Sequence, residues 1–309
     1  MHTQALTPLE RYSDTAEAGS AAVIRRYSTS FGLACRLLDR TMRRDIENVY
    51  ALVRVADEAV DGAAAEAGLT AAAIVDQLGR LEEETLSALS LGYSTNPMVH
   101  AFAQTARRAG IGADLVAPFF ASMRRDCDPQ GHSAASLGDY IYGSAEVVGL
   151  MCLRVFLSGL AVLPAERARL EHSARRLGAA FQKINFLRDL GQDGNELGRA
   201  YFPGVDPARL TEAQKSMLLA DLRADLDAAL PGLRVLPARP RRAVALAYGL
   251  FSELADRIEA CPAGVLVTRR VRVPAAVKLG LAAAVLAGIG PAFARDGDRP
   301  AAQAEGRAA

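Results

Sequence analysis

The stretch that is most informative about the fold reads Tyr50-Ala-Leu-Val-Arg54-Val-Ala-Asp57-Glu-Ala-Val-Asp61. At about 100° per residue of an α-helix, positions 50, 54, 57 and 61 fall within an arc of about 60°. One face of an otherwise apolar helix therefore carries a tyrosine, an arginine and two carboxylates.

A second polar stripe follows in Phe181-Gln182-Lys-Ile-Asn185-Phe-Leu-Arg188-Asp189-Leu-Gly-Gln-Asp193. Its Gln182, Asn185, Asp189 and Asp193 lie within about 80° of one another on a helix. Each stripe thus ends in two aspartates at i and i+4, a spacing that lets both carboxylates hold one hard cation. The ordinary alternative is a solvated stripe whose acids pair with arginines.

The apolar flanks of both stripes favour the cation. Carboxylates beside a core repel each other and lose hydration unless cations neutralise them. Mg²⁺ takes oxygen ligands and is commonly completed by substrate phosphates, so four aspartates facing one cavity predict a diphosphate or polyphosphate substrate. Neither glycine-rich phosphate loop, GxxxxGK[ST] or GxGxxG, is present, which favours diphosphate as a leaving group over phosphoryl transfer. Its departure leaves a carbocation, which an apolar cavity must protect from water.

The rest of the chain indicates an all-α protein. It has 309 residues, of which 50% are hydrophobic, and alternating runs of β-branched residues are missing. The helical period predicts ten helices, at residues 16–37, 42–61, 70–89, 97–109, 113–126, 134–160, 165–191, 211–229, 239–259 and 273–289. We expect one helical domain over 16–294, disordered tails over 1–15 and 295–309, and a mobile flap within the glycine-containing stretch 191–207.

Charge and composition exclude several classes. A formal net charge of +1 argues against a nucleic-acid partner. The four cysteines form no CxxC pair and the polar start resembles no signal peptide, so we expect a cytoplasmic protein. The apolar segment 279–294 is too short for a confident membrane span. It is either the last core helix or, with Arg269, Arg270, Arg272 and Lys278 beside it, a peripheral contact with the inner face of the membrane.

From Tyr27 to Leu281 the sequence resembles the squalene and phytoene synthase family. The two stripes look like its two aspartate motifs, and Gly198-Arg199-Ala-Tyr201-Phe-Pro203 continues the second. The resemblance implies a single-domain isoprenoid synthase helical bundle around a central cavity. It also implies Mg²⁺, or alternatively Mn²⁺, held by Asp57, Asp61, Asp189 and Asp193.

Further residues gain roles from this resemblance. Tyr140 would stand near the reacting cation, or alternatively be a core residue with a bonded hydroxyl. Ser144, Ala145, Val148 and Gly149 would leave room for a long chain, or simply pack helices. Substrate contacts are implied for Ser28, Ser30, Phe31, Tyr50, Arg54, Gln182, Asn185, Arg188, Tyr248, Arg270 and Lys278. Two departures stand out: Gln192 replaces a frequent acid, and Glu146 stands where a small residue is common.

The implied activity is the head-to-head condensation of two geranylgeranyl diphosphates to phytoene through a cyclopropyl diphosphate, in carotenoid biosynthesis with downstream carotenoid enzymes as partners. One alternative is farnesyl diphosphate giving dehydrosqualene or squalene. No dinucleotide fingerprint is visible, so we expect no NADPH. A second alternative is a non-catalytic family member that acts as a scaffold.

Overall fold

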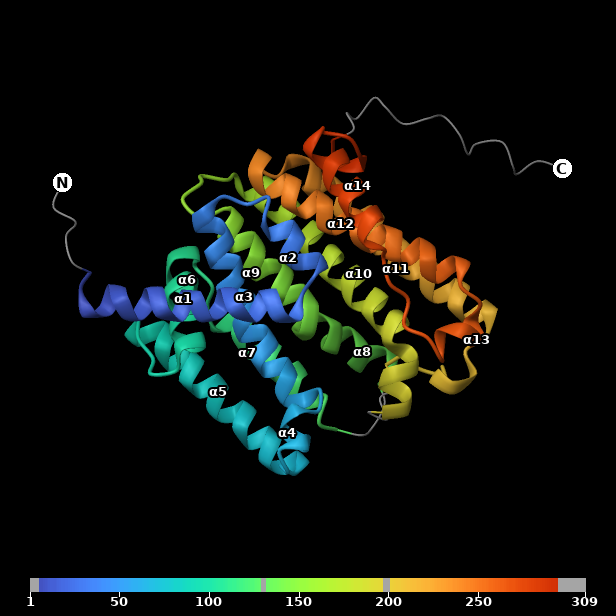
Figure 1. Ribbon diagram of the computed structural model, residues 1–309, viewed down its shortest axis with the longest axis horizontal. Coiled ribbons are helices and arrows are strands. Elements are labelled where there is room, and N and C mark those ends of the chain that lie inside the picture. The colour runs from blue at the N-terminus through green and yellow to red at the C-terminus, as the bar shows by residue number, and fades with distance from the viewer. Residues whose placement is uncertain (1–5, 129–131, 197–200, 294–309) are drawn as a thin grey trace.

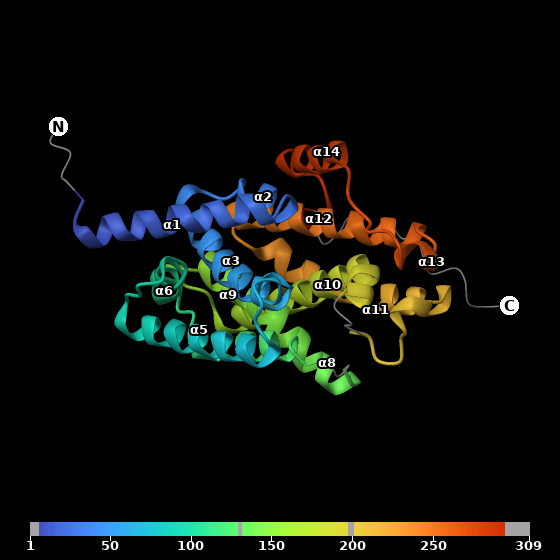
Figure 2. The same ribbon diagram turned by 60° about the horizontal axis from the view of Figure 1, so that its bottom comes forward.

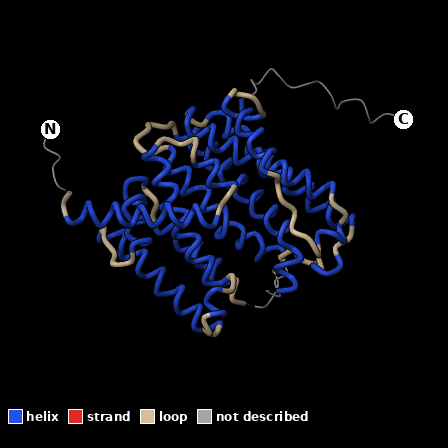
Figure 3. The backbone as a smooth tube through the Cα atoms, viewed as in Figure 1, coloured by secondary structure: helices blue, strands red, loops and turns tan. Residues whose placement is uncertain are grey.

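The computed structural model describes residues 6–128, 132–196 and 201–293, and all regular elements in these ranges are helical (Figure 3). The α-helices are α1 (Pro8–Tyr27), α2 (Ser30–Cys35), α3 (Arg40–Val60), α4 (Ala63–Glu66), α5 (Ala71–Leu91), α6 (Pro97–Ala109), α7 (Ala113–Arg125), α8 (Ala134–Ile141), α9 (Val147–Phe156), α10 (Pro164–Glu196), α11 (Glu212–Val235), α12 (Ala238–Ala260), α13 (Ala263–Leu266) and α14 (Ala275–Leu286). A π-helical turn, η1 (Tyr142–Glu146), and two 3₁₀ turns, η2 (Pro207–Arg209) and η3 (Pro291–Phe293), complete the set. The predicted all-α class is confirmed.

Helices α3, α9 and α10 occupy the middle of the molecule, with α1, α5 and α6 on one side and α11 to α13 on the other (Figure 1). Turned on its side, the molecule shows α1, α2 and α12 in one layer above α9 and α10, with α14 outermost (Figure 2). The central helices therefore have protein on several sides, and α9 in particular has an apolar sequence.

The buried side chains form two large cores. The N-terminal core gathers residues of α3, α5, α6, α7 and α9, among them Ile46, Leu52 and Phe102. The C-terminal core gathers residues of α10, α11 and α12, among them Leu187, Leu222 and Leu246. Both cores supply walls of the cavity described below.

The first helix begins earlier than the sequence led us to expect. Thr7 caps α1 with a capping box: its hydroxyl accepts from the Glu10 backbone N–H at 3.2 Å, and the Glu10 carboxylate accepts from the Thr7 N–H at 2.8 Å. The predicted disordered tail over 1–15 is therefore wrong from Pro8 onward. Residues 1–5 and 294–309, which include the predicted C-terminal tail, lie outside the described ranges.

Two other boundaries differ from expectation. The helix predicted over 134–160 is interrupted by η1, a π-helical turn of the kind that often marks a functional site. Helix α10 continues to Glu196, so the first part of the predicted flap over 191–207 is helical. Residues 197–200 of that flap are not among those described.

Close packing between α9 and α10 depends on two glycines. A Cβ on Gly149 would lie 2.6 Å from the carbonyl oxygen of Ala174, and one on Gly178 would lie 2.5 Å from that of Ala145. Only glycine allows the two backbones to approach this closely.

Candidate functional site

The first polar stripe forms a charged cluster at the C-terminal end of α3. Arg54 forms ion pairs with Asp57 and Glu58, and its Nη1 lies 3.9 Å from Asp61 Oδ2. The Arg54 guanidinium also stands 4.7 Å from the centre of the Tyr27 ring. The helical period thus brought Arg54, Asp57 and Asp61 together as the sequence predicted, with Glu58 as an additional acid.

The carboxyl group of Asp57 is in an unfavourable place for a charge. Only 32% of its side chain is exposed. Desolvation and the neighbouring Asp61 raise its pKa, against the opposing effect of Arg54, and the carboxylates of Asp126 and Glu58 raise it further. A bound divalent cation would remove this penalty, so the site has the electrostatics that such a cation requires.

The second stripe lies on α10. Asp189 forms an ion pair with the adjacent Arg188 and a second one with Arg270, whose Nε lies 2.8 Å from Asp189 Oδ1. Asn185, one turn earlier, has a buried Oδ1 without a hydrogen-bond partner among the described residues. An oxygen of this kind beside a carboxylate suits a cation or a hydrogen-bond donor of a ligand.

Asp193 belongs to α10, but the position of its side chain is not described, nor is that of Gln192. Within the part of the chain that the structure describes, no three His, Cys, Asp or Glu side chains form a metal cluster. Arg54 forms an ion pair with Asp57, and Arg188 and Arg270 form ion pairs with Asp189. The assignment of all four aspartates as metal ligands stays a prediction.

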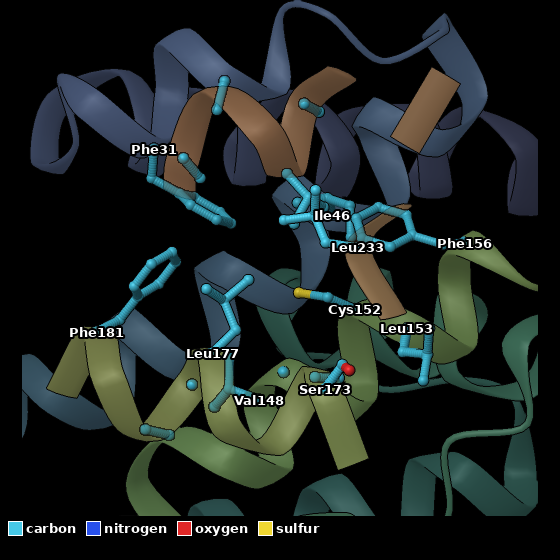
Figure 4. A pocket seen from close by; sticks show the side chains of 18 of the residues that line it. Phe31, Ile46, Val148, Cys152, Leu153, Phe156, Ser173, Leu177, Phe181 and Leu233 are labelled. Atoms are coloured by element: carbon cyan, nitrogen blue, oxygen red, sulfur yellow. The ribbon is translucent and has the colours of Figure 1, made fainter. Parts of the chain in front are cut away.

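A long apolar cavity lies between the two cores. Its empty volume is about 1120 Å³, including the part open to solvent. Its walls come from α2, α3, α9, α10, α11 and α12, and none of the described lining residues is charged. Polar side chains in the wall are few: Ser144, Ser173 and Gln182. Figure 4 shows Phe31 and Phe181 at one end and Phe156, Leu153 and Leu233 toward the other.

Both aspartate stripes lie beyond the same end of this cavity. On α10, the lining residues run from Leu170 to Gln182, and Asp189 follows two turns after Gln182. On α3, Ile46 and Val53 line the cavity and Asp57 follows one turn later. The Tyr50 ring stacks on Phe31 with ring centroids 5.8 Å apart, so α3 also leads toward the end marked by Phe31 and Phe181.

The segment before α2 borders this end. The Ser28 Oγ accepts a hydrogen bond from the Phe31 backbone N–H at 3.1 Å, and Ser28 also forms a hydrogen bond with Tyr50. Lys278 of α14 donates to the Thr29 hydroxyl at 3.0 Å. Ser30 is the first residue of α2 and is partly exposed.

Tyr140 of α8 is buried beside both stripes. Its hydroxyl donates to Asp126, 2.7 Å from Oδ1 and 3.0 Å from Oδ2. Asp126 in turn contributes to the raised pKa of Asp57 on α3. The Tyr140 ring lies 6.0 Å from Phe186 of α10 and 5.8 Å from Tyr201. Tyr140 therefore contacts Phe186 of α10 with its ring and, with its hydroxyl, Asp126, which acts on Asp57 of α3.

Tyr248 and Glu146 are buried but are not among the described residues that line the cavity. Tyr248 of α12 is buried in the C-terminal core, and the charged groups that act on its pKa are Asp227, Arg223 and Arg234 of α11 rather than the aspartate stripes. Glu146 is buried but points away from the cavity, because it forms ion pairs with Arg175 at 2.6 Å and Arg176 at 3.6 Å. The polarity of the cavity is therefore independent of Glu146.

Sequence reasoning missed Asp126, His132 and the stacking of Tyr201. His132 lies against Tyr140 with ring centroids 4.8 Å apart, and Tyr201 stacks on Phe186 at 4.0 Å. Asp126 follows the last residue of α7 and has no periodic partner, so only the tertiary structure reveals its contact with Tyr140. Tyr201 stands within the quoted second motif, which was the available signal for it.

Comparison with known proteins gives a consistent result. A model of the family "squalene/phytoene synthase" matches residues 24–276. The phytoene synthase of Mycobacterium tuberculosis is 30% identical over 285 residues, covering 86% of this chain and 89% of the relative. That of Pseudescherichia vulneris is 29% identical over 253 residues, covering 75% and 79%.

Solved structures resemble the fold. A dehydrosqualene synthase in complex with a ligand superposes with a TM-score of 0.75 at 22% identity, covering 91% of this chain and 98% of the other. The squalene synthase HpnC from Alicyclobacillus acidocaldarius superposes with a TM-score of 0.67 at 22% identity, covering 82% and 96%. At this identity the likeness establishes the helical architecture alone.

Proposed function

This chain belongs to the squalene/phytoene synthase family and is a prenyltransferase of isoprenoid biosynthesis, and from that premise we propose that it condenses two geranylgeranyl diphosphates head to head to phytoene in the cytoplasm. The observation that supports the proposal is a large cavity with no charged residue in its described lining, whose walls on α3 and α10 are followed along the same helices by Asp57 and Asp189. Such a site holds an anionic head group at its mouth and an apolar chain inside.

The chemistry divides into two ionisations. The first breaks the carbon–oxygen bond of one allylic diphosphate and releases that diphosphate. The double bond of the second substrate attacks the resulting cation, and loss of one proton closes the ring of a cyclopropyl diphosphate. The second ionisation releases the other diphosphate, and rearrangement with loss of one proton gives the linear hydrocarbon. The reaction as proposed needs no NADPH.

The residues present fit a divalent ion. Asp57, Asp61, Asp189 and Asp193 would hold Mg²⁺, or alternatively Mn²⁺, which would offset the charge of the departing diphosphate. Arg54, Arg188 and Arg270 would exchange their carboxylate partners for diphosphate oxygens. Lys278, Ser28, Ser30, Tyr50 and Asn185 would border the head group and its cation, whereas Phe31 and Gln182 would contact the chain and its first carbons.

Tyr140 would stabilise a cation or pass on a proton. Its hydroxyl is hydrogen-bonded to Asp126 and its ring lies in an aromatic group with Phe186 and Tyr201. Aromatic faces attract cations, and a tyrosine paired with a carboxylate is a competent proton carrier. Tyr248, which the family resemblance assigns to the diphosphate, is buried beside Asp227, Arg223 and Arg234 of α11.

Product analysis tests the proposal. The full-length protein is incubated with geranylgeranyl or farnesyl diphosphate and Mg²⁺, with and without NADPH, and the extracted hydrocarbon is identified by mass spectrometry. We expect phytoene from geranylgeranyl diphosphate, independent of NADPH and abolished by a chelator. A clear preference for farnesyl diphosphate would replace the substrate assignment. That alternative has some support, because a 4,4'-diapophytoene synthase of Staphylococcus haemolyticus is 28% identical over 196 residues.

A further inference from the structure

Helix α14 is apolar on every side. It reads Ala275-Ala-Val-Lys278-Leu-Gly-Leu-Ala-Ala-Ala-Val-Leu286, with a single charged residue. A helix that is hydrophobic all round is normally buried in a protein core or in lipid, because an amphipathic helix suffices at a protein surface.

The protein itself covers only one side of this helix. Val285 is buried, and Leu281 and Ala282 pack on the C-terminal core. On the remaining surface, Leu279 is 65% exposed, Leu286 is 57% exposed and Ile289, just beyond the helix, is 63% exposed. Figure 2 shows α14 standing apart at the edge of the molecule, on the outer side of α12. It is therefore not the buried core helix that the sequence allowed.

The charged residues in the chain segment that contains α14 all have one sign. Residues 261–293 include four basic side chains, Arg269, Arg270, Arg272 and Lys278, and no acidic one. Arg270 forms an ion pair with Asp189, and Lys278 donates a hydrogen bond to the Thr29 hydroxyl. Arg269 and Arg272 are exposed and form no ion pair with any carboxylate of the described residues. This distribution is complementary to an anionic surface.

The regular part of helix α14 is too short to cross a membrane. By length and composition alone, Ala275–Phe293 is the one described segment that could span a bilayer, and only 11% of it is buried. Its regular part has 12 residues, about 18 Å at the helical rise, against about 30 Å of hydrocarbon. Gly288 and Gly290 then turn the chain with φ of 74° and 131°.

From these four observations we propose that α14 and Ile289 form a docking surface for an anionic lipid bilayer, with the helix lying in the interface plane. Leu279, Leu286 and Ile289 enter the acyl boundary while Arg269 and Arg272 contact lipid head groups. Beneath α14, Ala243, Val244 and Ala247 of α12 line the cavity. The bilayer would thus lie next to the wall of the prenyl site, so that an apolar product could pass into lipid without crossing water.

Vesicle flotation tests the surface. The full-length protein is mixed with phosphatidylcholine vesicles with or without phosphatidylglycerol, and no substrate is present, so the outcome is independent of the reaction. We expect wild type to float with the anionic vesicles. The variant Leu279→Ser/Leu286→Ser/Ile289→Ser should bind at least about tenfold more weakly. Leu91→Ser, at a 75% exposed leucine on α5, is the matched control and should bind as wild type.

The basic residues have a separate test. Arg269→Gln/Arg272→Gln should lower binding to the anionic vesicles by a factor of about five per charge and remove the preference for phosphatidylglycerol. Wild type that ignores both vesicle types, or a triple variant that floats as well as wild type, would refute the proposal. Sedimentation velocity without vesicles tests whether a second copy of the chain covers this face instead. If wild type is a dimer and the triple variant is a monomer, the face is an interface between two copies of the chain.

Discussion

Arg54 holds the acidic end of α3 together by pairing with Asp57 and Glu58. This pairing compensates only part of the repulsion, since desolvation and Asp61 still raise the pKa of Asp57. A carboxylate whose charge lowers the stability of the folded protein is typical of a ligand-binding site.

The first prediction concerns this cost. Because its pKa is raised in the folded chain, Asp57 keeps a proton there that it has lost in the unfolded chain. The metal-free protein should therefore lose stability as the pH rises from about 4 through the raised pKa. Asp57→Asn should melt at a higher temperature than wild type at pH 8 in a chelator, while its prenyl-transfer activity falls by about 100-fold or more.

Thermal melts from acid to alkaline pH check the sign. Asp76→Asn serves as the control, because Asp76 on α5 pairs with Arg80 and is 59% exposed. A variant Asp57→Asn that melts below wild type at pH 8 would show that this carboxylate stabilises the fold instead.

The second prediction concerns Tyr140 and Asp126, which share a hydrogen bond of 2.7 Å. If they act as a unit, Tyr140→Phe and Asp126→Asn should each lower kcat by about tenfold or more, and the double variant should cost much less than the product of both effects. A double-mutant cycle on kcat measures this coupling. Full additivity of the two effects would separate Asp126 from the function of Tyr140.

The two kinds of site residue differ in what the sequence could predict. Arg54, Asp57 and Asp61 lie within a few turns of one helix, so the helical period alone predicts that they share a face. Asp126 and Tyr140 are separated by 14 positions and meet only because α8 turns back beside the end of α7. The packing of Tyr248 beside α11 is unpredictable for the same reason, because the neighbours of a helix face depend on tertiary structure.

At the scale of elements, the contact between α9 and α10 fixes one wall of the cavity. Gly149→Ala would bring a Cβ to 2.6 Å from the Ala174 carbonyl oxygen. We expect a loss of stability of about 1–3 kcal/mol in urea unfolding, because backbone must shift to make room. Gly79→Ala, on α5 with no atom within 4 Å of the new Cβ, should instead gain about 0.5–1 kcal/mol. Equal effects of both changes would contradict the close packing.

The length of the cavity should select the substrate. Cys152 of α9 lies in the wall away from the aspartate end, with its sulfur directed into the cavity (Figure 4). Cys152→Phe fills this part, so the ratio of turnover with geranylgeranyl to that with farnesyl diphosphate should fall by about tenfold or more. Cys152→Ser, which keeps the volume, should leave the ratio near that of wild type. An unchanged ratio in Cys152→Phe would place the chain ends elsewhere.

Element boundaries were predictable where a chemical signal stands in the sequence. The start of α1 has such a signal in Thr7, Pro8 and Glu10, although the polar composition of the tail suggested disorder. The exposure of α14 has no such signal, because a run of apolar residues has the same sequence pattern in a protein core and against lipid.

For the whole molecule, the aspartates come from both halves: α3 packs in the N-terminal core and α10 in the C-terminal one. A ligand that needs both stripes should stabilise the fold by joining these halves. Mg²⁺ together with inorganic diphosphate should raise Tm by roughly 5 °C, more than the sum of either alone. Scanning fluorimetry measures the shift, and Asp57→Asn should reduce it. A full shift with diphosphate alone would make the arginines sufficient for binding.

The all-α class and the two stripes follow from short-range periodicity, whereas the cavity follows from six helices that meet in space. Its size depends on side chains as distant in sequence as Phe31 and Ala247. No local pattern specifies such a volume, so the sequence alone does not predict the length of the prenyl chain that the cavity accepts.

The ion pairs of Arg54, Arg188 and Arg270 have one more consequence. Each guanidinium is already positioned and partly desolvated before any substrate arrives, so its reorganisation on binding is small. The proposed diphosphate would therefore replace carboxylate partners that these guanidiniums already have, instead of meeting unpaired charges. Its binding would be an exchange of ion pairs, in which the contacts to Asp57 and Asp189 are given up for contacts to phosphate oxygens.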